Sequence, residues 1–160
     1  QVLQRYSGEV PEAPAGRYRD YIAWLERQDP EGNEAFWRAQ LAELDEPTHL
    51  AEVYRTQASA LGHTGHAQHD QLFDAARTAR LAAFAREQKV TLNTVLQAAW
   101  ALLLQRHQGQ AAVCFGATVA GRPTELAGVE QQVGLFINTL PVVVSLRPEQ
   151  TVAQLLQTLQ

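Results

Sequence analysis

The residues that could bind a metal are gathered in one segment of the chain. His63, His66, His69 and Asp70 follow one another at spacings of three or less, with Gly65 among them. This spacing is not a standard zinc pattern, and no second pair of ligands lies nearby in the sequence. We therefore expect a solvated loop and no metal site, and tight one-to-one zinc binding in a calorimetric titration would overturn this expectation.

Two further residues could take part in nucleophilic or acid–base chemistry. Cys114 is the only cysteine and lies between Val113 and Phe115, an apolar setting in which a thiol packs as a small hydrophobic group. His107 falls near the end of a predicted helix, where it is expected to meet free carbonyl groups. The sequence contains no Gly-rich phosphate loop, nucleophile elbow or paired-carboxylate motif.

Composition and charge narrow the class of protein. The 160 residues are 46% hydrophobic and 19% charged, which is typical of a globular domain. A net charge of −4 gives no electrostatic footprint for nucleic acid, and no apolar run is long enough to cross a membrane. The chain has no Met and begins at Gln1, so we expect it to be a piece of a longer protein.

The charged residues are unevenly distributed along the chain. Residues 1–90 carry 24 Asp, Glu, Lys and Arg side chains, whereas residues 91–160 carry six. No charged side chain occurs between Gln131 and Leu146, and Arg122 is the only Lys or Arg between Arg106 and Arg147. A long uncharged stretch in a small chain is expected to lie in a core or against another protein surface.

Helices are predicted from apolar spacing and capping residues. Residues 1–6 resemble the tail of a helix, and the two prolines of 10–16 indicate a linker. The remaining helices are expected over 18–25, from Pro30 to the break at Glu46-Pro47, from the Asp74 cap to about Lys89, from the Thr91 cap to the stop at Gly109, and from Thr151 onward.

Specific core residues follow from the same spacing. The helix after Pro30 is expected to bury Trp37, Leu41 and Leu44, and the helix after Asp74 to pack through Leu81 and Phe84. The expected buried face of the helix after Thr91 consists of Leu92, Val95, Leu96, Ala99, Leu102 and Leu103. That of the last helix consists of Leu155, Leu156 and Leu159.

Strands are predicted in three places. They are a short one over Gln68–Phe73, a β-rich run over Val113–Val119 and a nearly apolar one over Asn138–Leu146. The order of helices and strands indicates an α/β or α+β fold.

Five segments together resemble condensation domains of nonribosomal peptide synthetases. Two match core motifs of that family: YRDYIAW at Tyr18–Trp24, and VGLFINT at Val133–Thr139 followed by Leu140-Pro141-Val142. The others are FWRAQL at Phe36–Leu41, TLNTVLQAAWALLL at Thr91–Leu104 and FGATVAGRP at Phe115–Pro123. The segments cover nearly the whole chain in the family's order and approximate spacing.

The resemblance implies a fold and a place within it. It implies an α/β (α+β sandwich) lobe like that of chloramphenicol acetyltransferase, with a partial sheet covered by helices. Residues 1–160 would be a single-domain fragment of the C-terminal lobe, with a helix tail and linker at 1–16, and a lobe at 17–160 whose floor loop spans about 120–139. The family's catalytic HHxxxDG motif is absent from the chain, which implies that it lies outside.

The resemblance also implies a reaction and its participants. The parent enzyme would form an amide between donor and acceptor thioesters, which carrier domains present on phosphopantetheine arms; no cofactor would be bound directly. The implied partners are the N-terminal lobe, the carrier domains and the adjacent adenylation domain, in the cytoplasm and without nucleic acid or membrane. The excised lobe is expected to self-associate through its unshielded apolar face.

Site roles are implied residue by residue. Asn138, Thr139 and Arg122 would be candidates on the tunnel side. For Thr139 a purely backbone role, and for Arg122 a structural pairing, are at least as favoured. Gly121, Pro123 and Gly134 would form the hinge of the floor loop, and Tyr18, Asp20 and Trp24 a structural motif. Val143 stands where the family often has Arg.

Two other functions remain open from the sequence. One is an epimerization or cyclization relative within the family, and the other is a non-catalytic module that docks carrier domains. The gene sequence upstream of Gln1 discriminates between catalysis and docking, because an HHxxxDG motif about one helix earlier favours condensation.

Overall fold

The computed structural model describes residues 6–8, 16–50, 54–55 and 68–160, which form two compact units. The first unit comprises described residues of Gln1–Trp37 together with Gly116–Leu140, and the second comprises those of Arg38–Phe115 together with Pro141–Gln160. The elements in chain order are α2 (Tyr18–Leu25), α3 (Pro30–Leu41), α5 (Ala75–Glu87), α6 (Leu92–Gln108), β1 (Ala112–Ala120), the 3₁₀ helix η1 (Val129–Gln131), β2 (Ile137–Ser145) and α7 (Val152–Leu159).

The helix ends of the second unit are capped as predicted. Asp74 accepts a hydrogen bond from the Arg77 amide at 2.6 Å to begin α5, and Thr91 accepts from the Thr94 amide at 3.1 Å to begin α6. Gly109 ends α6 in the left-handed region with φ 71°, a conformation that costs glycine little. Thr151 begins α7 with a reciprocal bond to Gln154. These ends form because the capping residue and its target are only three or four positions apart.

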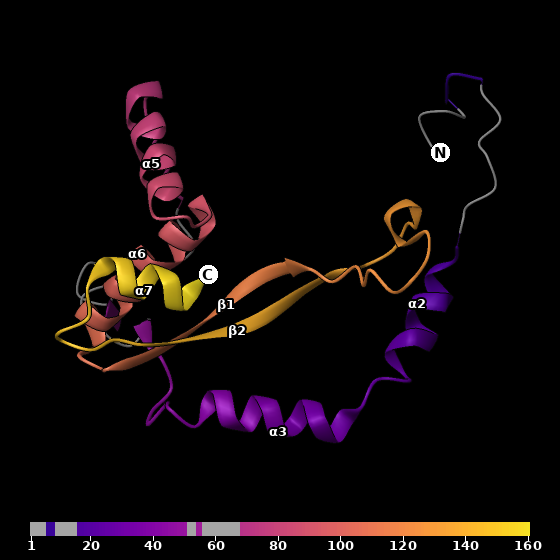
Figure 1. Cartoon of the computed structure of the whole chain (residues 1–160), viewed down its shortest axis with the longest axis horizontal. Helices are drawn as coiled ribbons and strands as arrows, with labels where there is room; N and C mark the ends of the chain where they lie inside the picture. The colour runs from indigo at the N-terminus through magenta and orange to yellow at the C-terminus, as the bar shows by residue number, and fades with distance from the viewer. Residues whose placement is uncertain (1–5, 9–15, 51–53, 56–67) are drawn as a thin grey trace. The chain divides into compact units, whose positions relative to one another are not determined.

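β1 and β2 pair as a two-stranded antiparallel hairpin (Figure 1). The Leu146 amide donates to the Ala111 carbonyl at 2.8 Å, and the Gly121 amide donates to the Phe136 carbonyl at 2.6 Å. These two bonds fix the register, in which even-numbered residues of β2 form hydrogen-bonded pairs with odd-numbered residues of β1. The backbone nitrogens of the odd-numbered residues of β2 therefore face away from β1. Pro141 therefore lies at a position whose backbone nitrogen faces away from β1, where a missing donor costs no ladder bond.

The second unit is built around an apolar core. One face of the hairpin supplies Val113, Val144 and Leu146, and α7 supplies Leu155 and Leu156. Two of the three predicted strands, those over Val113–Val119 and Asn138–Leu146, are thus confirmed together with the α7 leucines, and Leu159 packs against the same core. Phe84 of α5 also packs against this core, as predicted, and Leu81 of the same helix is half-buried.

The buried face of α6 differs from the predicted one. The structure buries Thr94, Ala98, Ala101 and Leu104. Of the predicted face only Val95 packs against the core, and Leu96 is 54% exposed. The other leucines of that face, Leu92, Leu102 and Leu103, are also exposed. Small alanine side chains allow neighbouring elements to pack closely against a helix. The face of α6 that contains Ala98 and Ala101 therefore lies against the core, although a leucine side chain would bury more apolar area.

Two other predictions were wrong. Residues Gln68–Phe73 form no strand, and Leu72 is 95% exposed; a strand is stable only when its backbone groups are paired, and neither described strand pairs with this segment. α3 buries none of its residues and ends at Leu41, before the predicted break. Of the residues predicted to be buried here, Leu41 is exposed and Trp37 and Leu44 are half-buried, because nothing in the described ranges fully covers their apolar side chains.

Some predictions lie outside the described residues. These are the helix tail over residues 1–5, the linker over 10–15, and the side chains of His63 and His66. Tyr6 is helical and Ser7 and Gly8 form a turn, as expected. Within the described ranges, no helix is long and apolar enough to cross a membrane.

Candidate functional site

The first unit brings together the two sequence motifs that stand furthest apart in the chain. The hydroxyl of Tyr18, at the start of α2, donates to the Leu135 carbonyl at 3.0 Å. The Tyr18 ring lies directly on Gly134, where any β-carbon would overlap it. The helix α2 is thereby packed on the residue 121–136 loop that joins β1 to β2, and Gly134 permits the contact because it has no side chain.

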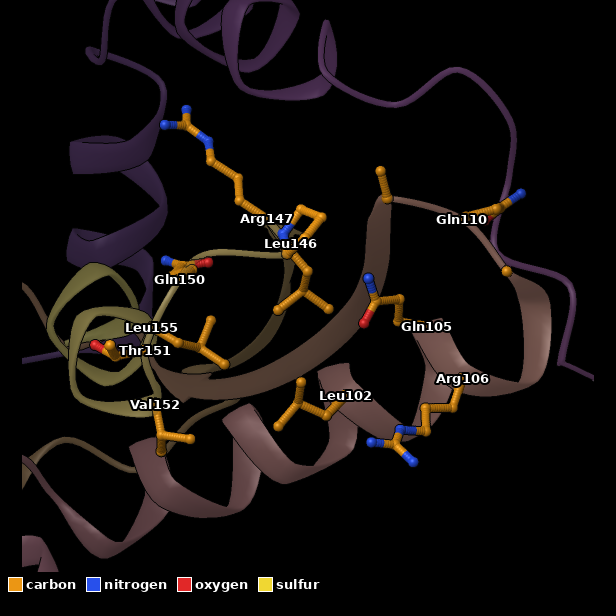
Figure 2. Close-up of a pocket in the computed structure, with 13 residues that line it drawn as sticks. Leu102, Gln105, Arg106, Gln110, Leu146, Arg147, Gln150, Thr151, Val152 and Leu155 are labelled. Carbon is orange, nitrogen blue, oxygen red and sulfur yellow. The ribbon is translucent and has the colours of Figure 1, made fainter.

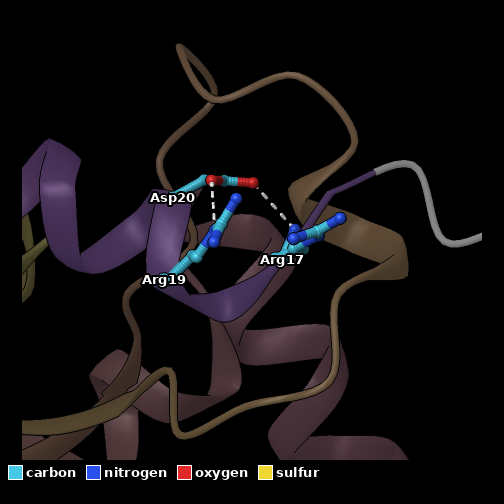
Figure 3. A network of polar contacts seen from close by, with 3 residues as sticks. All are labelled: Arg17, Arg19 and Asp20. Carbon is cyan, nitrogen blue, oxygen red and sulfur yellow. Dashed lines mark hydrogen bonds and ion pairs between the residues drawn. The ribbon is translucent and has the colours of Figure 1, made fainter.

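Asp20 fixes the start of α2 (Figure 3). Its carboxylate accepts from the Arg17 amide at 2.9 Å, and the Asp20 amide donates to the Arg17 carbonyl at 2.8 Å. The Arg19 guanidinium approaches the other carboxylate oxygen at 3.8 Å, an exposed pair that contributes little stability. Trp24 stacks on Tyr21 with ring centroids 6.1 Å apart. Asp20 thus caps the start of α2, and Trp24 packs on a neighbouring aromatic ring.

Phe136 is the centre of an aromatic cluster in the first unit. It is buried, lies edge-on to Tyr18 at 5.4 Å and lies tilted against Tyr21 at 4.8 Å between ring centroids. On the same ring, the Arg122 guanidinium carbon sits 4.0 Å from the centroid. Such aromatic and cation–π contacts each contribute about 0.5–1.5 kcal/mol.

Arg122 finds its partners within its own loop. Its Nη1 donates to the Val129 carbonyl, and to the Gln132 carbonyl at 3.1 Å. The Val129 carbonyl lies at the first residue of η1 and also accepts from the Gln132 amide at 3.2 Å, whereas the Gln132 carbonyl directly follows η1. The side chain therefore spans the loop, with its guanidinium carbon over the Phe136 ring.

Gln132 is a buried polar side chain with unusual surroundings. It is 3% exposed, and neither its Oε1 nor its Nε2 has a hydrogen-bond partner in the part of the chain that the structure describes. Its amide lies against Gly16, where a β-carbon would overlap it. A buried amide without partners costs about 1–3 kcal/mol, so Gln132 is expected to lower the stability of the first unit.

Asn138 and Thr139 lie at the beginning of β2 and are exposed. The Asn138 Oδ1 accepts from the Thr139 amide at 2.8 Å, and that amide faces away from β1 in the register described above. The Thr139 Cγ2 lies 2.7 Å from where a β-carbon on Gly116 would stand. Gly116 thus leaves room for the Thr139 methyl group.

The predicted hinge residues lie at the two ends of the same loop. The Gly121 amide donates to Phe136, and a β-carbon at Gly121 would stand 3.2 Å from that carbonyl oxygen. The Pro123 carbonyl accepts from the Leu126 amide at 3.3 Å and so begins a turn. Gly134 is the contact surface for Tyr18. The structure brings Gly121, Arg122, Gly134 and Tyr18 into one unit around Phe136.

The other candidates from the sequence lie in the second unit. Cys114 is half-buried, desolvation raises the pKa of its thiol, and its amide donates to the Thr48 hydroxyl at 2.9 Å. These features agree with a packing role. His107 does not meet a helix carbonyl in the described structure; its ring nitrogens lie 2.6 and 3.0 Å from the Tyr54 hydroxyl, which reaches the end of α6 from an exposed segment.

A hollow of about 710 Å³ in the second unit lies beside the ends of α6 and β2 and the start of α7 (Figure 2). Arg106 and Gln105 line it from α6, and Arg147 and Gln150 line it from the segment that precedes α7. The hollow contains no carboxylate, thiol or histidine among its lining residues. It therefore offers hydrogen-bond donors and no acid–base pair. Elsewhere in the described ranges, no three His, Cys, Asp or Glu residues gather as metal ligands.

Three residues that make the central contacts of the first unit were not identified from the sequence. Phe136 and Tyr21 belong to the two motifs, but nothing local indicates that they touch across more than 100 positions. Gln132 could have been noticed, because it is a polar residue at the start of the uncharged run of residues 131–146.

Comparison with known proteins places these motifs in a family. The family described as "Condensation domain" matches residues 2–160. The chain is 44% identical over 147 residues to one component of the linear gramicidin synthase of Brevibacillus parabrevis, covering 92% of this chain and 3% of that protein. It is 39% identical over 149 residues to surfactin synthase subunit 3 of Bacillus subtilis (strain 168), covering 92% and 11%. The chain thus spans only a small part of these curated relatives.

Solved structures agree in fold. The first condensation domain of the calcium-dependent antibiotic synthetase, in complex with a substrate analogue, superposes with a TM-score of 0.69 at 24% identity, covering 98% of this chain and 34% of that one. The X-domain from teicoplanin biosynthesis gives a TM-score of 0.62 at 24% identity, covering 97% and 36%. Condensation domains have the chloramphenicol-acetyltransferase-like fold predicted above. The chain belongs to the condensation-domain family of nonribosomal peptide synthetases, and corresponds to part of such a domain.

Proposed function

We propose that this chain is a single-domain fragment, the first part of the C-terminal lobe, of a domain that joins two carrier-bound thioesters. The acceptor's α-amine attacks the donor thioester carbonyl, the carbon–sulfur bond breaks, and an amide and a free thiol result. The observation that carries the proposal is the contact of Tyr18 in YRDYIAW with Gly134 and Leu135 in VGLFINT. The two motifs that define the resemblance are thereby neighbours in one folded unit.

Alignment is the contribution expected from such a lobe. An α-amine has an ordinary pKa of about 7.7–8.0, so part of it is already neutral at pH 7. Holding two tethered reactants in attack geometry supplies about 7–11 kcal/mol, whereas a general base contributes about 10²–10⁴-fold in rate. Without the HHxxxDG motif and the N-terminal lobe, the fragment is expected to be inactive alone.

Asn138 and Thr139 are the residues we propose to face the substrates. Both are exposed at the start of β2, and Asn138 keeps its amide nitrogen available while its oxygen binds the Thr139 amide. An uncharged surface with amide and hydroxyl groups suits a phosphopantetheine arm, whose own amides are neutral. The partners are then the N-terminal lobe, carrier domains and an adenylation domain, in the cytoplasm.

The test uses Asn138→Ala in the parent synthetase. Removing the side-chain amide is expected to lower the rate of amide formation about tenfold while the domain stays folded, as judged by circular dichroism. Asn93→Ala, an exposed asparagine on α6, is the matched control and is expected to leave the rate unchanged. Wild-type turnover of Asn138→Ala would remove Asn138 from the site, and a parent that forms no amide would refute the proposed reaction.

A further inference from the structure

Arg122 occupies a position that the proposed substrate-side role does not explain. Its guanidinium is directed at the backbone of its own loop, where Nη1 is shared between the carbonyls of Val129 and Gln132. Those carbonyls lie three residues apart, at the two ends of the turn formed by η1. A single cationic donor that holds both of them fixes the turn against unwinding.

The guanidinium of Arg122 also contacts the Phe136 ring, with the guanidinium carbon 4.0 Å from the ring centroid. Phe136 lies at the far end of the loop, next to the start of β2, and its carbonyl accepts from the Gly121 amide, next to Arg122 in the chain. Arg122 therefore connects the beginning, the middle and the end of the residue 121–136 loop. A lysine cannot reproduce this arrangement, because an ammonium group lacks the planar face that stacks on the ring.

The Phe136 ring also contacts Tyr18 and Tyr21 of α2. Tyr18 meets Phe136 edge-on, and the Tyr18 hydroxyl binds the carbonyl of Leu135, the preceding residue. Displacement of Phe136 would therefore disturb both the loop and the contacts between the loop and α2. Ile137, Asn138 and Thr139 follow Phe136 directly in the chain, so the position of Phe136 determines where β2 presents its exposed polar groups.

We propose that Arg122 is a positioning residue: by clamping the carbonyls of Val129 and Gln132 and stacking on Phe136, it holds the residue 121–136 loop and thereby the start of β2. This inference rests on the proposed function for its effect on the reaction, and on the geometry alone for its effect on the loop. Arg122 touches no reacting atom in this role. It acts through Phe136 and the backbone that continues to Asn138.

The experiment uses the full synthetase module with Arg122→Met, which keeps an unbranched side chain and removes the charged guanidinium. Hydrogen exchange of the amides in residues 121–136 is expected to become about tenfold faster, because the loop opens locally. The kcat for amide formation is expected to fall about tenfold with KM for the acceptor carrier changed less than about twofold, since alignment and not binding is lost. Arg80→Met, an exposed arginine in the middle of α5, is the control.

A chemical-rescue experiment distinguishes a positioning role of Arg122 from nonspecific destabilisation of the domain. Arg122→Ala leaves the two carbonyls and the Phe136 face without their partner, and added guanidinium ion is expected to restore at least about half of the lost kcat and the slow exchange. Exchange in residues 121–136 that stays at the wild-type rate in Arg122→Met would overturn the clamp. Faster exchange with unchanged kcat would overturn its role in the reaction. A wild-type module that forms no amide refutes the proposed function, while the exchange rates still decide on the clamp.

Discussion

Each of the two units is stabilised internally by a different kind of contact. In the second unit, aliphatic side chains from α6, α7 and the hairpin form one continuous core. In the first unit, the buried residues among those described are only Val129, Gln132 and Phe136, and side chains such as Tyr18 and Arg122 bind backbone carbonyls directly. Buried area stabilises the second unit, whereas the fit of individual groups stabilises the first.

The difference has a consequence for substitution. An aliphatic core loses stability in proportion to the volume removed, since its contacts have no direction. A unit held by directed contacts responds to shape and polarity at single positions, even where little area is buried. The following substitutions test this contrast.

The largest effect is expected in the second unit from Leu156→Ala. Leu156 is 1% exposed and belongs to the core, so the free energy of unfolding should fall by about 2–5 kcal/mol in urea denaturation. The matched control is Leu96→Ala on α6, which is expected to change that free energy by less than about 0.5 kcal/mol. Equal losses at the two positions would show that the exposed face of α6 is covered after all.

A smaller effect is expected in the first unit from Gly134→Ala. The added β-carbon would overlap the Tyr18 ring, and overpacking of this kind costs about 1–3 kcal/mol in the free energy of unfolding. In a double-mutant cycle with Tyr18→Ala, most of this cost should disappear, because the ring that it meets is gone. A cost that persists without the ring would have to arise from the backbone of the loop.

The smallest effect, and one of opposite sign, is expected from Gln132→Leu. Replacing a buried amide that lacks partners with an apolar side chain of similar size should raise the free energy of unfolding by about 1 kcal/mol. Gln105→Leu, on a half-buried residue of α6, serves as the comparison. If Gln132→Leu destabilises the chain instead, its amide is bonded in solution, and the first unit contains one more directed contact.

Local features of the fold could be predicted from the sequence. The caps at Asp74, Thr91 and Thr151 and the stop at Gly109 depend on residues within one helical turn, and they occur as expected. The predicted strand over Asn138–Leu146 agrees with β2 to within one residue at each end, because a run of apolar residues with several β-branched side chains favours a strand.

Features that depend on distant partners could not be predicted in the same way. α6 has an alanine-rich and a leucine-rich side, and only the packing of α7 and the hairpin decides that Ala101 is inside and Leu103 outside. At the candidate site, the resemblance supplied the motifs but not their contacts. Tyr18 and Leu135 are 117 positions apart, and the partners of Arg122 are carbonyl groups, which every residue has and no sequence pattern marks.

The outer edge of β2 bears on how this chain meets other copies of itself. At Pro141 the edge has no N–H to offer, and at Thr139 the outward N–H is already bound by Asn138. A strand from a second molecule would therefore find two successive donor positions closed to it, which blocks edge-to-edge growth of a continuous intermolecular sheet at that site. Any aggregation of the isolated chain should then begin elsewhere, and fibre-type assembly through this strand is disfavoured by its own backbone.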